Sequence, residues 1–235
     1  MRKAAIVPAY NEAGSIGGVV AELQTAHPEF EIVVVDDGST DETAALARRA
    51  GAEVVVLPFN LGIGGAVQTG LEWARRRGCD LVVQVDGDGQ HDPREIEKLL
   101  QPIVAGSADV AVGTRFAGDR TYRASMTRRI GIGLFAGLVS LIVRQRVTDT
   151  TSGFRAMNAR AIELFADEYP YDYPEVEATV LIFRHRLRLV EVPVTMRQRE
   201  AGRSSITVFR SLYYMGKVSL ALFVGLLRPR PALAK

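Results

Sequence analysis

The chain has 235 residues, which is enough for one large domain or for one domain with a small appendage. An apolar share of 47% and a mean hydropathy of +0.07 fit a globular core. The single cysteine, Cys79, excludes an intrachain disulfide and a zinc site built from cysteines, and it is compatible with a reducing cytosol.

The net charge of +2 is small, but basic residues are concentrated near the end of the chain. Residues 197–235 contain a single acid, Glu200, and the basic residues Arg197, Arg199, Arg203, Arg210, Lys217, Arg228, Arg230 and Lys235. Such a segment suits an anionic lipid surface or a phosphate ligand. A nucleic-acid partner is not expected, because no aromatic stacking platform or basic recognition helix accompanies the charge.

Strands and helices alternate through the first half of the chain. Runs of apolar and β-branched residues predict strands at residues 4–7, 31–35, 53–57, 81–85 and 109–113. Helical periodicity and capping residues predict helices at residues 15–26, from 40 or 41 to about 50, from after 65 to about 78, and from 93 to about 104. This order predicts an α/β fold with a mostly parallel sheet and helices on both faces.

The second half departs from this alternation. Residues 130–143 are apolar nearly all round and too short to span a bilayer, so they form either a buried helix or one in a membrane interface. A short strand is expected at residues 190–194. Residues 206–227 predict a long apolar helix that lies on a membrane surface, because Arg210 and Lys217 disfavour a span. We therefore divide the chain into a main domain, 1–205, and a membrane-interface helix with a basic tail, 206–235.

Polar residues follow each of the first four predicted strands. These segments are Pro8-Ala9-Tyr10-Asn11-Glu12, Asp36-Asp37-Gly38-Ser39-Thr40, Asn60-Leu61-Gly62-Ile63-Gly64 and Asp86-Gly87-Asp88-Gly89-Gln90. Each segment alone is ordinary turn chemistry. Together they indicate a binding crevice, because open α/β sheets bind ligands beyond the carboxyl ends of their strands.

The segment after the fourth strand carries the strongest signal. Asp86 and Asp88 are separated by one glycine and repel each other unless a cation lies between them. Mg²⁺ or Mn²⁺ on a nucleoside diphosphate is such a cation, since hard ions take oxygen ligands and keep substrate phosphates in their shell. The alternative is a turn with solvated carboxylates.

In combination, these motifs resemble the family-2 glycosyltransferases with the GT-A fold, over about residues 4–210. Within that family the chain is similar to the dolichol-phosphate mannose synthase and polyprenol-phosphate glycosyltransferase branch. Two further segments carry this narrower resemblance: Thr150-Thr151-Ser152-Gly153-Phe154-Arg155, and Val192-Pro193 followed by Arg199-Glu200-Ala201-Gly202-Arg203-Ser204. The resemblance implies a Rossmann-like, mostly parallel sheet with additional apolar or amphipathic helices in the C-terminal half.

The resemblance also implies roles on the donor side. Tyr10, Glu12 and Asp37 match positions that hold the base and ribose of a nucleotide sugar, in a loop stiffened by Pro8. Asp88 and Gln90 match metal-binding positions, and Asp86 lies close to the nucleotide or the metal.

Basic residues match the remaining donor and acceptor positions. Arg115 and Arg199 match residues beside the diphosphate, and arginine suits phosphate because its planar fork stays charged. Arg128-Arg129, with Ser152 and Arg155, match the region that receives an acceptor phosphate. Ser205 stands where many relatives carry lysine, so one cation is missing unless Arg203 replaces it.

No general base is assigned. A phosphate acceptor is already anionic near neutral pH and needs positioning and neutralisation more than proton removal. Asp149 and Glu177 are the spare acids, and each is expected to orient an arginine or the backbone. His91 is interpreted as a loop residue near the site.

The resulting expectation is an inverting, metal-dependent glycosyltransferase of cell-envelope glycan synthesis that uses Mg²⁺ or Mn²⁺. It would move a sugar from a UDP- or GDP-sugar to a polyprenyl phosphate at the cytoplasmic face of the membrane. Many relatives in the resembled family have C-terminal membrane spans, whereas this sequence ends at Lys235, so attachment is expected to be peripheral or through a separate small membrane protein. No signal peptide precedes the first strand. Alternatives are a transferase with a soluble or glycan acceptor, a dinucleotide oxidoreductase, and a membrane-docking module with a decayed site. Val67 breaks the glycine fingerprint of the oxidoreductase.

Overall fold

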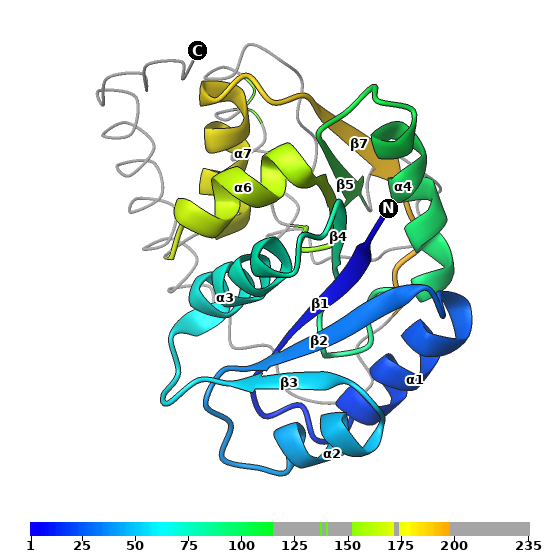
Figure 1. Cartoon of the computed structure of the whole chain (residues 1–235), viewed down its shortest axis with the longest axis vertical. Helices are drawn as coiled ribbons and strands as arrows, with labels where there is room; N and C mark the ends of the chain where they lie inside the picture. Colours follow the sequence, from blue (N-terminus) through cyan, green and yellow to red (C-terminus); the bar gives the residue numbers. More distant parts are fainter. Residues whose placement is uncertain (115–136, 138–139, 141–151, 172–173, 198–235) are drawn as a thin grey trace.

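The computed structural model describes residues 1–114, 137, 140, 152–171 and 174–197. These residues form a seven-stranded sheet with helices packed against both of its faces (Figure 1). The expected α/β class is confirmed. Most of residues 130–143, the boundary at 205 and all of 206–227 lie outside the described residues, so the C-terminal interface helix stays a prediction.

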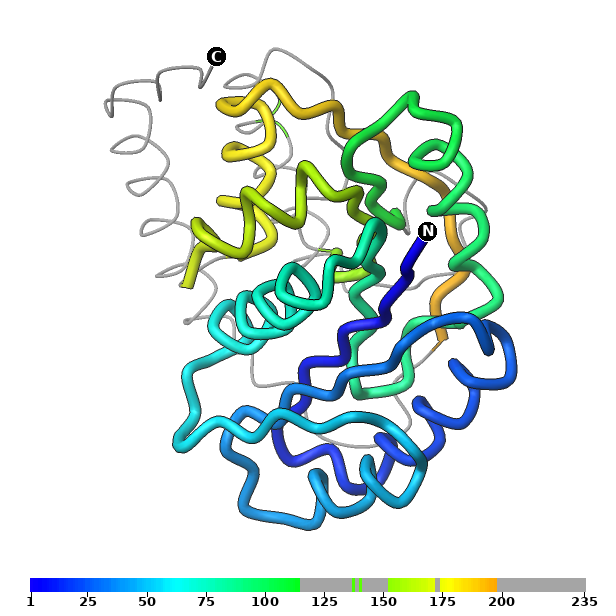
Figure 2. The backbone as a smooth tube through the Cα atoms, viewed as in Figure 1, coloured from blue at the N-terminus to red at the C-terminus, as the bar shows by residue number. Residues whose placement is uncertain are grey.

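The strand order in the sheet is β3-β2-β1-β4-β6-β5-β7. The strands are β1 (Lys3–Ala9), β2 (Phe30–Asp36), β3 (Glu53–Val56), β4 (Leu81–Gln84), β5 (Val110–Thr114), β6 (Arg155–Asn158) and β7 (Leu189–Pro193). Only β6 runs antiparallel to its neighbours, β4 and β5, so the sheet is mostly parallel as expected. Figure 2 shows β1 running between β2 and β4.

The central strands are buried on both faces, which is why they are continuous apolar runs rather than alternating ones. On one face lie α1 (Ile16–Ala26), α2 (Thr43–Arg49) and α4 (Ile96–Val104), the last preceded by the 3₁₀ turn η1 (Pro93–Glu95). On the other face lie α3 (Gly62–Arg76), α6 (Ala159–Asp167) and α7 (Pro174–Arg184). Each set of helices closes its own apolar core against the sheet.

Close packing of α3 explains two of its glycines. A Cβ at Gly70 would lie 2.3 Å from Cγ2 of Ile6 in β1, and a Cβ at Gly64 would lie 2.3 Å from the Pro170 carbonyl oxygen. Real Cβ atoms do not approach other atoms so closely, so both positions require glycine. The helix therefore rests directly on β1, with its N-terminus at the carboxyl edge of the sheet.

Several elements of the second half were not predicted from the sequence. No strand is expected from the sequence near residue 155, whereas the structure forms β6 there, followed by α6 and α7. β6 is only four residues long and begins with a charged residue, so it lacks the apolar run that marks the other strands. The third helix also begins earlier than expected, at Gly62.

A buried acid, Asp109, connects the ends of three neighbouring strands, β5, β6 and β7. Asp109 is 1% exposed and accepts hydrogen bonds from Asn158 Nδ2, Arg160 Nη1 and Arg188, the last through its backbone and side chain. Burial raises the pKa of Asp109, but these hydrogen bonds and the nearby arginine charges outweigh it and hold the pKa at about 2. Asp109 thereby joins β5, β6 and β7.

We predict that Asp109→Asn lowers the free energy of unfolding near neutral pH by about 1 kcal/mol or more, after allowance for solvent around the exposed arginines. Because the folded-state pKa is depressed, the contribution is full above the unfolded pKa and is lost as the pH falls toward about 2. Urea denaturation from neutral to acid pH measures it. Glu97→Gln on the exposed face of α4 is the control. A wild-type-minus-variant difference that does not shrink in acid contradicts the prediction.

Candidate active site

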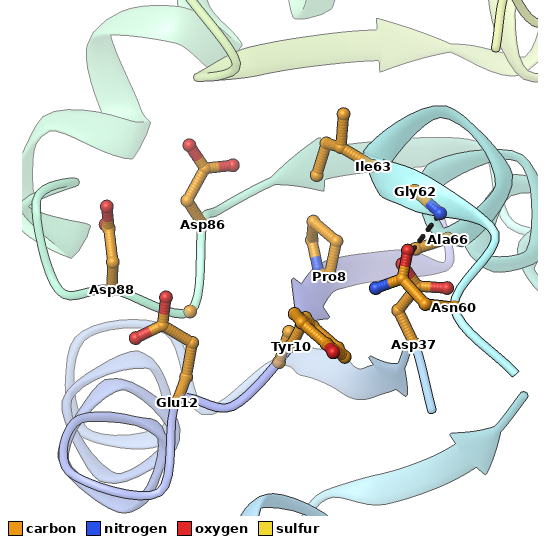
Figure 3. Close-up of a pocket in the computed structure, with 12 residues that line it drawn as sticks. Pro8, Tyr10, Glu12, Asp37, Asn60, Gly62, Ile63, Ala66, Asp86 and Asp88 are labelled. Carbon is orange, nitrogen blue, oxygen red and sulfur yellow. Dashed lines mark hydrogen bonds between the residues drawn. The ribbon is translucent and has the colours of Figure 1, made fainter. Parts of the chain in front are cut away.

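The loops after β1, β2, β3 and β4 meet at the carboxyl edge of the sheet and line a cavity of about 270 Å³ (Figure 3). The strand order reverses here, because β2 and β3 lie on one side of β1 and β4 lies on the other. Ligand crevices in open α/β sheets open at such reversals. The lining residues are Pro8, Ala9, Tyr10, Glu12, Asp37, Asn60, Gly62, Ile63, Ala66, Asp86, Gly87 and Asp88. All four polar strand ends singled out in the sequence therefore contribute to one cavity.

The loop after β1 turns sharply at Asn11, which has a φ of 54°. This left-handed conformation is costly for most residues and is tolerated by asparagine. The Asn11 N–H donates to Ser39 Oγ at 2.9 Å, and its Oδ1 accepts from the Thr40 N–H at 2.9 Å. The turn lies between Tyr10 and Glu12, which both line the cavity, and is fastened to the loop after β2.

Asp37 connects the second strand end to the third. Its carboxylate accepts the N–H groups of Leu61 at 2.7 Å and Gly62 at 2.9 Å, at the N-terminus of α3. Burial raises the pKa of Asp37, and the two N–H donors oppose that rise. Asp37 thus supports the start of α3, which explains why the helix begins at Gly62, and it lines the cavity as well.

Three other carboxylates gather on the opposite side of the cavity. Figure 3 shows Glu12, Asp86 and Asp88 together there, with Asp37 and Asn60 across from them. The Gln90 N–H donates to Asp88 Oδ1 at 3.0 Å, and Ser15 Oγ lies 3.2 Å from Glu12 Oε2. Like charges held this close favour a cation between them.

The chain brings the carboxylate loops together through backbone contacts. Ser15 Oγ donates to the Gly87 carbonyl oxygen at 2.7 Å, and the Gly87 N–H donates to the Pro8 carbonyl oxygen at 3.3 Å. A Cβ at Gly87 would lie 3.2 Å from both that oxygen and Ala9 Cβ. The glycine between the two acids therefore lets the fourth loop pack against the end of β1.

The donor set suits a hard divalent ion that is shared with a substrate. Carboxylate oxygens are the ligands that Mg²⁺ and Mn²⁺ take. Among the described residues, no group of three or more His, Cys, Asp or Glu side chains could hold a metal ion by itself. The carboxylates that line the cavity could supply one or two oxygen ligands to such an ion.

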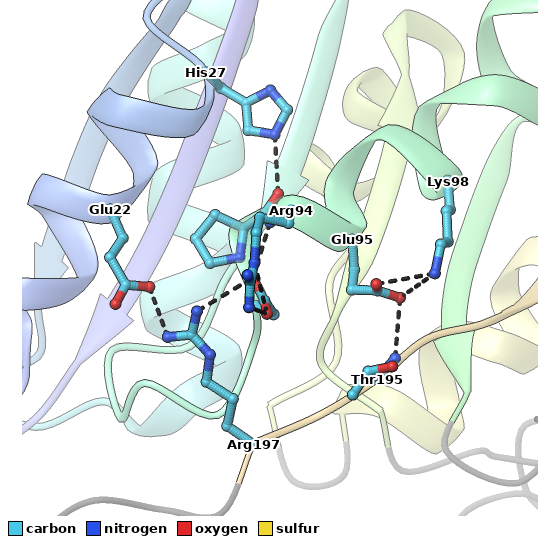
Figure 4. Close-up of polar contacts among 9 residues, drawn as sticks. Glu22, His27, Arg94, Glu95, Lys98, Thr195 and Arg197 are labelled. Atoms are coloured by element: carbon cyan, nitrogen blue, oxygen red, sulfur yellow. Dashed lines mark hydrogen bonds and ion pairs between the residues drawn. The ribbon is translucent and has the colours of Figure 1, made fainter. Parts of the chain in front are cut away.

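Gln90 contributes backbone contacts at the edge of this site. Its side chain is not among the cavity-lining groups, while its carbonyl oxygen accepts the Arg197 N–H at 2.9 Å. Arg197 also pairs with Glu22 at 2.7 Å and with Asp92 at 3.2 Å (Figure 4). A hydrogen bond from Arg94, with the Arg197 charge nearby, outweighs burial and holds the pKa of Asp92 at about 2. The segment after β7 is thereby fastened beside the carboxylate loop.

Ser152 and Arg155, expected on the acceptor side, are buried next to the cavity rather than among its lining residues. Arg155 is 1% exposed and donates to the Ser152 and Glu175 carbonyl oxygens at 3.0 and 2.7 Å. Its Nη1 has no hydrogen-bond partner among the described residues. Two of its contacts therefore hold the protein together, and the nitrogen Nη1 is left over.

The remaining expected site residues divide into two groups. Arg115, Arg128, Arg129, Asp149, Arg199, Arg203 and Ser205 lie outside the described residues. Glu177 is half-buried on α7 and is not a lining residue of the cavity.

The sequence did not predict the contribution of two residues at the site, Asn11 and His91. Asn11 could have been found, since an asparagine directly after a strand is typical of a left-handed turn. His91 is 5% exposed, and its Nδ1 accepts the Asp86 N–H at 3.0 Å. No sequence pattern pointed to that contact, which depends on the path of the loop between the two residues.

Solved structures identify the fold. Glucosyl-3-phosphoglycerate synthase from Mycobacterium tuberculosis, in a crystal structure with Mn²⁺, UDP and glucosyl-3-phosphoglycerate, superposes with a TM-score of 0.71 at 22% identity. The match covers 95% of this chain and 79% of that one. The architecture is therefore that of the GT-A glycosyltransferases.

Sequence comparison then gives the family. Residues 4–165 match the model of glycosyl transferase family 2. Polyprenol monophosphomannose synthase of Mycolicibacterium smegmatis is 32% identical over 217 residues, 88% of this chain and 81% of the relative. Undecaprenyl-phosphate mannosyltransferase of Micrococcus luteus is 33% identical over 216 residues, 88% of each. The chain belongs to glycosyl transferase family 2 and is a glycosyltransferase.

We predict that Asn11→Ala lowers the free energy of unfolding by about 1–2 kcal/mol, through left-handed strain and lost hydrogen bonds. Asn11→Gly should recover the conformational part, because glycine adopts positive φ without strain. Chemical denaturation measures both variants, and nucleotide affinity reports whether Tyr10 and Glu12 keep their positions. Equal destabilisation by alanine and glycine would show that the backbone conformation is not what Asn11 provides.

Proposed function

We propose that the chain is an inverting, metal-dependent glycosyltransferase that moves a sugar from a nucleoside diphosphate sugar, UDP- or GDP-linked, to a polyprenyl phosphate. The observation that carries the proposal is the cavity at the strand-order reversal, with buried Asp37 on one side and Glu12, Asp86 and Asp88 on the other. The relatives named as polyprenyl-phosphate mannosyltransferases support the acceptor.

The donor nucleotide is proposed to lie with its base and ribose toward Asp37 and its diphosphate toward Asp86 and Asp88. Tyr10 and Ile63 are 46% and 41% exposed and line the cavity, so they offer apolar surface to a base. Pro8 stiffens the backbone beneath them. Each Asp37 carboxylate oxygen accepts one N–H, from Leu61 or from Gly62 at the start of α3, and each has a second lone pair for a base N–H or a ribose hydroxyl.

Mg²⁺ or Mn²⁺ is proposed to be held by Asp88, with Asp86 beside the nucleotide or the metal and Gln90 as a further ligand. When bound, the ion would act as a Lewis acid that neutralises the departing diphosphate. The Gln90 N–H orients Asp88 by donating to Oδ1. The Mn²⁺ and UDP in the structural neighbour support this choice of ion by analogy of fold.

Transfer is proposed as a single displacement. An oxygen of the acceptor phosphate forms a bond to the anomeric carbon from the face opposite the diphosphate. The bond from that carbon to the diphosphate oxygen breaks, and its electron pair leaves on the nucleoside diphosphate, so the configuration inverts. No general base is required, because the attacking phosphate is already ionised. Asp149 and Glu177 are proposed to orient neighbouring groups.

Arginines are proposed to balance the charge of both phosphate groups. Arg115 and Arg199 would pair with the donor diphosphate, and Arg129 with the acceptor phosphate. Ser152 and Arg155 would support the acceptor side. The left-over Arg155 Nη1 donor and the backbone contacts of its Nε and Nη2 are consistent with that role.

The lipid acceptor implies work at a membrane. Among the described helices, none is long and apolar enough to cross a bilayer. We propose peripheral attachment at the cytoplasmic face; docking through a separate small membrane protein stays a prediction of the sequence. A soluble or glycan acceptor is the competing assignment.

We predict that Asp88→Ala abolishes sugar transfer while the protein still unfolds at a similar denaturant concentration, because the half-buried Asp88 carboxylate lines the cavity and is not part of the apolar core. Calorimetry should show that Mn²⁺ no longer strengthens binding of UDP or GDP. Asp80→Ala, at the opposite end of β4, is the matched control and should keep both properties. Wild-type turnover in Asp88→Ala would contradict the proposed role of Asp88 in holding the metal ion.

We predict that the purified protein glycosylates detergent-solubilised polyprenyl phosphate and binds anionic vesicles more strongly than neutral ones, because anionic lipid attracts basic segments. One labelled donor, offered to a panel of polyprenyl phosphates, soluble phosphates and glycans, measures the acceptor preference. Transfer to a soluble or glycan acceptor alone, without vesicle binding, would refute the lipid acceptor and leave the family assignment untouched.

A further inference from the structure

We propose that His91 is a positioning residue that fixes both the backbone and the carboxylate of Asp86, so that the carboxylate pair is already in place when the donor and its metal bind. The effect on metal and donor rests on the proposed function. The contacts themselves do not depend on it.

One imidazole ring faces Asp86 with both of its nitrogens. Nδ1 accepts the Asp86 backbone N–H at 3.0 Å, and Nε2 lies 3.7 Å from Asp86 Oδ2. A backbone N–H can only donate, so Nδ1 must present its lone pair. The neutral ring therefore carries its proton on Nε2, on the side of the Asp86 carboxylate.

The ring has little freedom to turn away from this geometry. His91 is 5% exposed and is stacked on Phe154, with ring centroids 4.6 Å apart and planes 11° from parallel. Its backbone forms a bridge with Met196, in the segment after β7. A ring held on one face and at its backbone loses little further entropy when it orients Asp86.

The other side of Asp86 is confined as well. A Cβ at Gly153 would lie 3.0 and 3.1 Å from the two carboxylate oxygens of Asp86, so the carboxylate rests against bare backbone. Gln84 Nε2 donates to Asp86 Oδ1 at 3.4 Å. Asp86 therefore has His91 near Oδ2 and at its backbone N–H, Gln84 at Oδ1, and the Gly153 backbone beside both carboxylate oxygens.

These contacts favour positioning over direct ligand binding for His91. The ring is buried and is not among the groups that line the cavity. Both nitrogens already face Asp86. Partners that orient a metal-binding carboxylate commonly change metal affinity or activity by about 10-fold to 100-fold when they are removed.

Three substitutions at His91 distinguish the contribution of its two ring nitrogens from that of ring stacking. His91→Phe keeps the ring that stacks on Phe154 and removes both nitrogens. His91→Asn keeps an acceptor at the position of Nδ1, and His91→Gln places a polar group closer to the position of Nε2. His185→Phe, beyond the end of α7 and outside the cavity lining, is the control for the same chemical change.

We expect His91→Phe to raise the Mn²⁺ concentration for half-maximal activity and to lower kcat/KM by about 10-fold or more. His91→Asn should restore most of the loss, because it restores the acceptor for the Asp86 N–H. Thermal unfolding of each variant identifies any that fail to fold. If one of the three His91 variants fails, the other two are compared with each other and with the wild-type protein. Wild-type behaviour of His91→Phe, or an Asn variant no better than the Phe variant, overturns the proposal.

A second measurement does not use activity. The protein has 3 histidines, so nuclear magnetic resonance of isotope-labelled imidazole nitrogens, with His91→Asn for assignment, reads the His91 tautomer directly. A lone pair on Nδ1 and a proton on Nε2 are expected, and the reverse tautomer overturns the proposal.

Binding of UDP or GDP with Mn²⁺, measured by calorimetry, distinguishes the two hypotheses. If wild-type protein binds neither nucleotide although the expected tautomer is present, the proposed function fails and the contact to Asp86 stands. If wild-type protein and His91→Phe bind equally tightly, the positioning role fails and the function stands.

Discussion

Four carboxylates line one small cavity, and holding them there against their mutual repulsion is the constraint on which the site depends. Each is anchored differently. Asp37 accepts two N–H groups at the start of α3, Asp88 accepts the Gln90 N–H, and Glu12 lies beside the Ser15 hydroxyl. Asp86 lies against His91 and Gln84. The protein thus maintains negative charge at a place where the proposed divalent cation could balance it.

The scaffold makes this possible by close backbone packing. The parallel strands β1, β2 and β4 end at the same edge, so their loops meet without long connections. Gly87 and Gly153 allow backbone to pass within contact distance of Pro8 and of the Asp86 carboxylate. A side chain at either position would push the loops apart, so the glycines shape the site although they carry no chemistry.

The sequence predicted the first half of the fold well, because buried parallel strands are apolar runs and their polar ends are easily recognised. It could not predict β6, whose first residue is a buried arginine held by the carbonyl oxygens of Ser152 and Glu175. Nor could it find the second task of Asp37, because the contact joins residues 24 and 25 positions apart. Motifs identify which residues gather, whereas their hydrogen-bond partners depend on how the chain packs.

The antiparallel strand β6 also connects the residues proposed for the acceptor side to those proposed for the donor side. β6 lies between β4 and β5. The segment that precedes it, residues 152–154, therefore runs next to Asp86, and the Gly153 backbone packs against the Asp86 carboxylate. Phe154 stacks on His91, and His91 in turn contacts Asp86 and bridges to Met196. Phe154, next to Gly153, therefore contacts the ring that we propose positions Asp86. A parallel strand in this place would enter the sheet from the opposite edge, and the residues that precede it could not then contact Asp86.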